Sequence, residues 1–333
     1  MIMQEVKLDS KDIALLFLLE KDARIPLTHL AKKIGLSKQA VRYKIERLKE
    51  LGVIERFITQ LDITRLGYTN YEVWLQLTTA SEEEKKEFIG HLVSHVNTRW
   101  VAECGGKWDI AIAVLARNIA HFDRIFNDEL MKGNWEKVGH FDNTVVVSLY
   151  NYNKQFLEKS SLKRDVVLFG GEKDIVQFDA LDLKILEKIS QDARIPTIRI
   201  AASVEASPLT VKNRLAKLKK NGTITRFKTL INPSKLGREG NEILFSLHNM
   251  GPEEEKTLRM YCENNPNTTF FIKSVGRWNY DVALEVNGQE ELQRELTNLR
   301  NLLRDHIKEY EIVSTPKIHK FDYLPGDLLR TIR

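Results

Sequence analysis

The side chains best suited to chemistry in this 333-residue chain form a run of basic, amide and hydroxyl residues near the N-terminus. If residues 37–50 form a helix, Val41, Ile45 and Leu48 share one face and the polar side chains lie opposite. Arginine and glutamine can each make two hydrogen bonds to one base edge, whereas lysine and arginine also suit phosphate oxygens. We therefore expect DNA contacts, with the last two on phosphates, from Ser37, Lys38, Gln39, Arg42, Tyr43, Lys44 and Arg47.

The same spacing of apolar and polar residues returns in residues 207–220. The residues expected to contact DNA there are Ser207, Thr210, Lys212, Asn213, Arg214 and Lys217. A basic helix can also be no more than a solvated surface, but a Ser-capped basic helix that occurs twice favours DNA contact. The exposed faces differ between the copies, so we expect them to prefer different DNA half-sites.

These helices need positioning elements, and the chain repeats those too. Residues 22–26 and 192–196 are both DARIP, and at this offset of 170 about 20 of the positions 8–67 are identical, without a gap. In each copy a helix would end before the proline, a short second helix would follow, and a Ser-capped third helix would end at Gly52 or Gly222. Helix, turn, capped helix is the layout of a helix-turn-helix. The strand-like residues 54–58 would follow as a wing or exit strand.

Charge follows the repeat. Residues 1–60 hold 12 Lys/Arg and 8 Asp/Glu, and residues 176–230 hold 11 and 5, whereas residues 61–152 and 231–333 are net acidic. Alternating sign of this kind is expected of nucleic-acid-binding modules fused to non-binding ones. We predict helix-turn-helix domains at 1–60 and 176–230, α/β domains at 61–152 and 231–333, and a linker at 153–175.

Each acidic block has a regular order of elements. In the first we expect a strand at 71–79, a helix opened by the Ser81 capping box, strands at 98–104 and 108–114, a helix at 119–131 and a strand at 143–149. This order, β-α-β-β-α-β, predicts a ferredoxin-like domain. The predicted fold class is α+β: two helix-turn-helix (winged-helix-like) domains alternate with two ferredoxin-like domains. The strand tryptophans Trp74, Trp100 and Trp278 are expected in cores or interfaces.

The chain resembles the Lrp/AsnC (feast/famine) family of prokaryotic transcription regulators, present twice in tandem. The resemblance is carried by Asp9 and Asp12, Asp22-Ala23-Arg24, Leu36-Ser37, Val41, Lys44, Arg47-Leu48, Gly52-Val53-Ile54, Leu66-Gly67, the turn Gly106-Lys107-Trp108-Asp109, and their counterparts in the second half. It implies a sequence-specific regulator of double-stranded DNA whose α/β domains dimerise. Here the two halves could pair within one polypeptide, as a pseudo-dimer that reads two non-identical half-sites and could associate further.

The resemblance also implies an amino-acid-like effector beside the Gly-x-x-Asp turn. The candidate residues are Glu103, Gly105, Gly106, Trp108 and Asp109. A two-residue insertion in the second copy would move Asp281 out of register, so the first half is the better candidate. The alternative is that the glycines form a hairpin turn and Trp108 packs in an interface.

Other function classes find less support. Two cysteines are too few for a disulfide scaffold or a four-cysteine zinc site, and they indicate a reducing cytoplasm. We expect neither a signal peptide nor a membrane-spanning segment. No catalytic motif occurs, and we predict that the protein is not an enzyme and has no cofactor or metal. The pair His91/His95 is expected on a solvated helix face. Two alternatives stay open: a sirohaem-decarboxylase-like enzyme, which resembles the same family, and a non-specific architectural DNA-binding protein.

Overall fold

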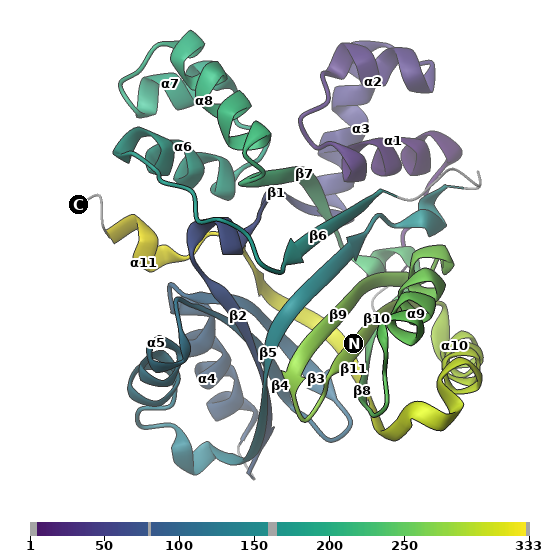
Figure 1. Cartoon of the computed structure of the whole chain (residues 1–333). Helices are drawn as coiled ribbons and strands as arrows, with labels where there is room; N and C mark the ends of the chain where they lie inside the picture. The colour runs from purple at the N-terminus through teal and green to yellow at the C-terminus, as the bar shows by residue number, and fades with distance from the viewer. Residues whose placement is uncertain (1–4, 79–80, 159–164, 331–333) are drawn as a thin grey trace.

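A computed structural model describes residues 5–78, 81–158 and 165–330 of the chain. Two helical heads lie at one end of the molecule and two α/β domains lie at the other (Figure 1). The first head contains α1 (Ser10–Lys21), α2 (Leu27–Ile34) and α3 (Lys38–Glu50), and the second contains α6 (Ala180–Gln191), α7 (Thr197–Ser203) and α8 (Pro208–Lys220). Within these ranges, no helix combines the length and apolar character that crossing a bilayer requires.

The predicted caps form in both heads. The Ser37 hydroxyl accepts a hydrogen bond from the Ala40 backbone N–H at 3.1 Å, and Ser207 does the same for Thr210 at 3.0 Å. Before α3 the chain turns through Gly35 at φ +66°, whereas the second head places Glu205 at φ +54° in the same position. A side chain with a Cβ is strained in this left-handed region, so the second turn is the less relaxed of the two.

The expected exit strand joins the two heads. β1 (Ile54–Leu61) pairs antiparallel with β7 (Ile224–Ile231) in a two-stranded sheet. Each head is also bound to the opposite half of the chain, because the Asn232 N–H donates to the Val53 carbonyl at 3.0 Å and the Asp62 N–H donates to the Thr223 carbonyl at 2.9 Å. In addition, α1 packs against β7 and α6 packs against β1, so each head packs on the exit strand of the other.

The α/β domains have the predicted order of elements. The first consists of β2 (Thr69–Leu77), α4 (Glu82–Ser94), β3 (Thr98–Gly105), β4 (Ile110–Ala116), α5 (Ile119–Asp123) with a π-helix (Arg124–Leu130), and β5 (Val138–Tyr152). The second consists of β8 (Glu239–Leu247), α9 (Pro252–Asn264), β9 (Thr268–Gly276), β10 (Tyr280–Val286), α10 (Gly288–Leu303) and β11 (Ile307–Phe321). One face of each sheet packs on its own helices, and the two inner faces share a core with Trp74, Trp100 and Trp278.

The last strand of each domain passes from one sheet to the other. The first part of β5 pairs with β2 and its second part pairs with β9, while β11 pairs first with β8 and then with β3. This explains why β5 extends well beyond the predicted 143–149. The exchange closes the strands around a common core, so the two halves pair as the subunits of a dimer would.

The structure corrects the predicted two-residue insertion in the second copy. Ile110 and Tyr280 begin equivalent strands 170 residues apart, so Asn279, and not Asp281, is the counterpart of Asp109. The Asp109 carboxylate accepts the Leu77 backbone N–H at 2.8 Å, and the Asn279 side-chain oxygen accepts the Leu247 N–H at the same distance. The sequence prediction matched Asp109 to Asp281 because both are aspartates. The structurally equivalent residue is Asn279, which makes the same backbone hydrogen bond as Asp109.

The repeat changes length further along. Val138 and Ile307 begin equivalent strands only 169 residues apart, which leaves one additional residue in the first half. The π-helix lies in this interval, and within it the Met131 N–H donates to the Phe126 carbonyl five residues earlier, at 2.8 Å. A π-turn is the usual way for a helix to absorb one extra residue.

The predicted linker contains regular structure. A turn of 3-10 helix (Gln155–Leu157) follows β5, and β6 (Val166–Gly170) then pairs back onto β5. At Gly170, φ is +84° and an added Cβ would lie 2.4 Å from the Val147 carbonyl oxygen, so only glycine fits there. Further short turns lie at Ile63–Leu66, Trp135–Lys137, Pro233–Leu236 and Arg304–His306.

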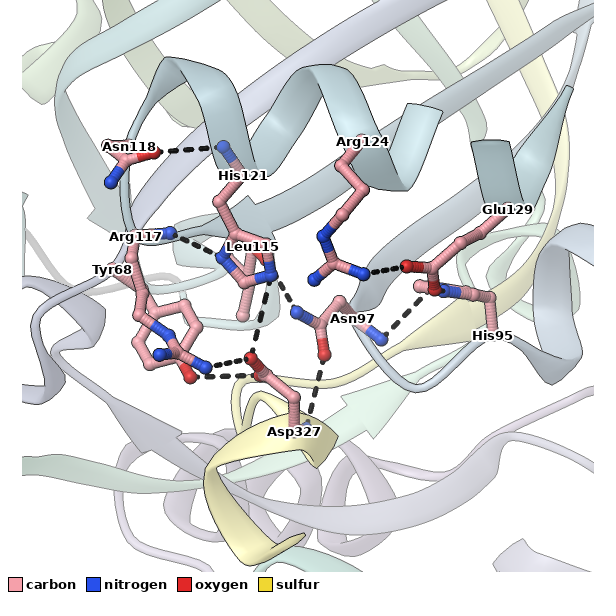
Figure 2. Close-up of polar contacts among 10 residues, drawn as sticks. All are labelled: Tyr68, His95, Asn97, Leu115, Arg117, Asn118, His121, Arg124, Glu129 and Asp327. Atoms are coloured by element: carbon pink, nitrogen blue, oxygen red, sulfur yellow. Dashed lines mark hydrogen bonds and ion pairs between the residues drawn. The ribbon is translucent and has the colours of Figure 1, made fainter. Parts of the chain in front are cut away.

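The C-terminal segment, with α11 (Gly326–Leu329), folds back onto the first half of the chain. Figure 2 shows its anchor: the Asp327 carboxylate accepts hydrogen bonds from the Tyr68 hydroxyl and the Arg117 guanidinium, both at 2.9 Å, and lies 3.7 Å from His121. Burial, followed by Asp327, raises the pKa of Tyr68 to about 12. These contacts fix the position of Tyr323, three residues before α11.

Candidate nucleic-acid interface

In the first head, α3 exposes the face that the sequence predicted. Lys38, Gln39, Arg42 and Tyr43 are exposed, and Tyr43 keeps 70% of its surface accessible. Val41, Ile45 and Leu48 on the opposite face are buried. Arginine and glutamine on this face can bond base edges, so the face has the composition of a DNA-contact surface.

In the second head, α8 presents a different face. Leu209, Lys212, Asn213 and Ala216 are exposed there, and Leu209 keeps 65% of its surface accessible. The helix carries five basic side chains and no acidic one, whereas α3 carries five basic and two acidic side chains. We call α3 and α8 the recognition helices. The second has fewer groups that can read bases and a higher charge density.

Two of the predicted phosphate contacts have protein partners. The Lys44 ammonium lies 2.7 Å from Asp9 and 2.8 Å from Asp12, and the Arg47 guanidinium lies 3.2 Å from Asp12. The hydrogen bond from Lys44 is the main reason why the pKa of Asp9 is lowered. Asp12 is 1% exposed, so its charge is compensated inside the protein and the two cations fix α3 against α1.

The second head repeats this arrangement with the two cations exchanged. Arg214 lies 2.5 Å from Asp179 and 3.1 Å from Asp182, and Lys217 lies 3.3 Å from Asp182. Sequence reasoning assigned the four cations to DNA and expected Asp9 to cap the first helix, but it did not predict that the aspartates pair with these cations. The signal was available, because acid and base are repeated together at the offset of 170. Among the described residues, none forms an ion pair with Lys38, Arg42 or Lys212.

A reciprocal clasp between the heads was not predicted. The Arg24 guanidinium donates to the Ala193 carbonyl at 2.8 Å, and the Arg194 guanidinium donates to the Ala23 carbonyl. Each guanidinium also lies over a phenylalanine ring of the other head, at 5.2 Å for Arg24 and 5.3 Å for Arg194. Together with the β1–β7 pairing, the clasp fixes the two recognition helices relative to each other.

The candidate effector residues lie in the turn between β3 and β4. Gly106 has φ +105°, Trp108 is 1% exposed and packs in the shared core, and Asp109 accepts the Leu77 N–H. Glu103 lies 2.5 Å from the His319 imidazole. Burial alone would raise the pKa of Glu103, but the bond to His319 and nearby lysines lower it overall. Gly105 is close to Ser314 on β11. These contacts agree with the turn-and-packing alternative, and effector binding here stays a prediction.

The histidine pair makes protein contacts. His91 Nε2 lies 3.1 Å from the carbonyls of Glu129 and Leu130, and His95 Nε2 lies 2.8 Å from the Glu129 carboxylate. His95 caps the end of α4 and is not on its exposed face. Figure 2 shows that Arg124 binds the same carboxylate. Within the described ranges, no group of three or more metal-ligating side chains occurs.

Comparison with known proteins agrees with this geometry. A family model described as winged helix-turn-helix DNA-binding matches residues 8–55 and 178–225. An uncharacterized HTH-type transcriptional regulator of Pyrococcus furiosus is 32% identical over 124 residues, which cover 37% of this chain and 83% of that regulator. The HTH-type transcriptional regulator LrpA of Pyrococcus horikoshii is 42% identical over 62 residues, 19% of this chain and 44% of LrpA.

Both heads are therefore winged helix-turn-helix domains of the DNA-binding type. The chain belongs to the Lrp/AsnC family of HTH-type transcription regulators. The match to the Pyrococcus furiosus regulator covers most of that protein but little more than a third of this chain, so such a relative corresponds to one of the two halves.

The complete two-headed architecture also has a solved counterpart. The siroheme decarboxylase NirDL superposes with a TM-score of 0.62 over 97% of both chains, at 14% sequence identity. At that identity the likeness concerns the fold alone.

Proposed function

We propose that this protein is a sequence-specific transcription regulator that binds double-stranded DNA as a single-chain pseudo-dimer. The observation that carries the proposal is that two different recognition helices, α3 and α8, are held in one fixed relation by β1–β7 pairing and the arginine clasp. Identical heads related by a two-fold axis require a palindromic operator. Unlike heads on the same frame favour an operator with two unlike half-sites.

The proposed roles of the side chains follow from their exposure. Arg42 and Gln39 read base edges at the first half-site, and Asn213 reads one at the second, because arginine, glutamine and asparagine can bond base edges bidentately. Lys38 and Lys212 bind phosphates. Lys44, Arg47, Arg214 and Lys217 support the helices through their aspartates, and any phosphate contact they make is secondary to that role.

A footprint on the DNA upstream of the gene, with competitor DNA present, tests the proposal. We expect two adjacent protected segments of different sequence. On separate duplexes that each carry one half-site, Arg42→Ala should lower affinity for one duplex by about 5- to 100-fold, and Asn213→Ala should lower affinity only for the other. Equal losses on both duplexes in either variant would contradict unlike heads, and protection independent of sequence would indicate the architectural alternative.

The proposal has further parts. The protein is not an enzyme, acts in the cytoplasm without cofactor or metal, responds to an amino-acid-like effector and can associate beyond the pseudo-dimer. Its support is that its relatives are named as regulators. Size-exclusion chromatography with light scattering tests the association, since a strict pseudo-dimer has the mass of one chain, 38.6 kDa.

The second candidate is a tetrapyrrole decarboxylase, because the whole fold matches one. A cavity of about 710 Å³ lies between the sheets, lined in part by Glu72, Glu242 and Asp281. Burial is the first cause that raises the pKa of each of these groups, to about 8 for Glu242. Basic side chains line the same cavity, among them Lys154, Lys228 and Arg238, and these suit the carboxylates of such a substrate. Absorbance of the purified protein in the haem region, and release of carbon dioxide from added sirohaem, would support the enzyme instead.

A further inference from the structure

A second cavity, of about 270 Å³, lies where the first half meets the linker and the C-terminal segment. Its walls are mostly apolar and include Ile63, Val146, Val147, Leu149, Phe169 and Tyr323. Phe169 belongs to β6, and Tyr323 is held by the Asp327 anchor of Figure 2. The cavity is thus closed by two segments that lie outside the repeated units.

A buried cation lines this cavity. Arg99 on β3 is only 6% exposed, and its guanidinium lies over the rings of Phe321 at 5.4 Å and Tyr323 at 4.9 Å. No carboxylate among the described residues lies within 4.0 Å of it. Buried arginines are normally paired with an acid, because the aromatic faces compensate only part of the charge. Arg99 interacts electrostatically with the buried Glu72 carboxylate and with Tyr323, but no acid is paired with it directly, so its guanidinium has capacity for an anion.

A buried acceptor lines the same cavity. Asn70 on β2 is 4% exposed, and its side-chain N–H donates to the Glu72 carboxylate at 3.1 Å. Its side-chain oxygen has no hydrogen-bond partner among the described residues. A buried acceptor left without a donor costs stability, so a ligand that brings a donor would be favoured.

We propose that this cavity binds one small apolar carboxylate that carries a hydrogen-bond donor next to its carboxylate. Arg99 binds the carboxylate in its planar fork, the Asn70 oxygen accepts from the donor, and the valines, leucine and aromatic rings enclose the apolar body. Glu172 in the lining is exposed to solvent, and buried Glu72, which bonds Asn70, acts on the guanidinium only from beyond ion-pair distance. This site is separate from the turn at Gly105–Asp109 and from the DNA interface.

The site exists once per chain. The positions equivalent to Arg99 and Asn70 in the second half are Thr269 and Gly240, at the same offset of 170. The strand that covers the first cavity, β6, comes from the linker, and the described residues after β11 include no strand. The proposal therefore includes a stoichiometry of one ligand per chain. If the site were present in both repeated units, each chain would bind two ligands.

Isothermal titration calorimetry of the full chain, without DNA, tests the proposal. The probe is 2-hydroxy-4-methylpentanoate, and leucine tests an ammonium in place of the hydroxyl donor. We expect saturable binding of at least one of the two, at one per chain. 4-Methylpentan-1-ol, which lacks the carboxylate, should bind about tenfold more weakly or worse, and 4-methylpentanoate, which lacks the donor, should bind several-fold more weakly.

Two variants place the binding in this cavity. Arg99→Met should abolish it. Because that change removes a buried cation and could unfold the chain, Val147→Phe is the second variant: Val147 is 39% exposed at the cavity wall, so a larger side chain there fills the space with little effect on the core. Val275→Phe, at an exposed valine on β9 outside this cavity, is the matched control and should bind normally.

Four results would overturn the proposal: equal affinity for the alcohol, unchanged binding by Val147→Phe, two ligands per chain, or no heat from any probe at millimolar concentration. The footprint of the unmodified protein is measured separately, so failure here leaves the DNA-binding proposal standing, and the reverse also holds.

Discussion

Replacement of Asp12 by asparagine would test whether a buried carboxylate holds the first recognition helix in place. The two Asp12 oxygens receive the Lys44 ammonium at 2.8 Å, the Arg47 guanidinium at 3.2 Å and the Asp9 backbone N–H at 3.1 Å. Asparagine keeps the size of the side chain, but it loses the charge and directs an amide N–H₂ toward a cation. The change thus isolates the electrostatic contribution.

The magnitude follows from burial. Removing one partner of a fully buried ion pair costs about 3–5 kcal/mol. Here Asp12 is 1% exposed, but the side chains of Lys44 and Arg47 are 16% and 36% exposed and can turn toward water, so the lower end applies. We expect a loss of about 3 kcal/mol in the free energy of opening of the first head, which corresponds to roughly 100-fold faster local opening.

Native-state hydrogen exchange resolves this, since α1 and α3 amides should exchange about 100-fold faster while α6 and α8 amides stay unchanged. Glu46→Gln is the matched control, because it removes an exposed ion pair with Lys49, worth less than about 1 kcal/mol. If Asp12→Asn accelerates exchange no more than Glu46→Gln does, the buried carboxylate does not hold α3. A different result would make Lys44 a phosphate contact. Lys44→Ala would then leave amide exchange unchanged, and the slope of log K for DNA binding against log salt concentration would become smaller in magnitude by about 0.9.

Four further outcomes can be checked. Arg24→Ala should weaken binding to an operator with both half-sites by about tenfold while affinity for one half-site changes little, as gel-shift titrations would show; equal losses would exclude a clasp role. Glu205→Gly should stabilise the second head by roughly 1 kcal/mol in thermal unfolding, because glycine relieves the left-handed backbone, and destabilisation would argue against strain there. Burial raises the pKa of Glu242 to about 8, above its ordinary 4.5, so its contribution to stability is full below pH 4.5 and is lost as the pH rises through 8. In urea unfolding measured against pH, Glu242→Gln should flatten that decline in stability. An unchanged pH profile would refute this role of Glu242. Asp109→Asn should be nearly neutral, as Asn279 makes the same bond, whereas Asp109→Ala should cost about 1–3 kcal/mol; equal costs would contradict the backbone-cap role.

The local signals in the sequence were sufficient for the elements. Ser37 and Ser207 cap the recognition helices as predicted, and the capping box at Ser81 opens α4. These features depend on residues within a few positions of each other, which sequence periodicity and capping rules describe directly.

The features that the sequence did not reveal depend on contacts between distant residues. The partners of Arg24 and Arg99 lie more than 160 residues away, and β6 became a strand because β5 offers a free edge beside it. The insertion at Asp281 was predicted wrongly for a related reason: the backbone hydrogen bond at Asn279 is visible only once Leu247 lies next to it. No local pattern encodes such a neighbour.

Fusion of the two units in one chain removes a constraint that symmetry imposes on a homodimer. In a homodimer any substitution appears on both sides of the axis, so a base-reading change in one head changes both half-sites. Here α3 and α8 differ on their exposed faces while the contacts that hold them, from Asp12 and Asp182 to the arginine clasp, are retained in both copies. The retained residues define the frame, and the divergent ones are where half-site preference would be set. The same reasoning applies to the cavity at Arg99, because β6 and the C-terminal segment both lie against the first half and complete a site there.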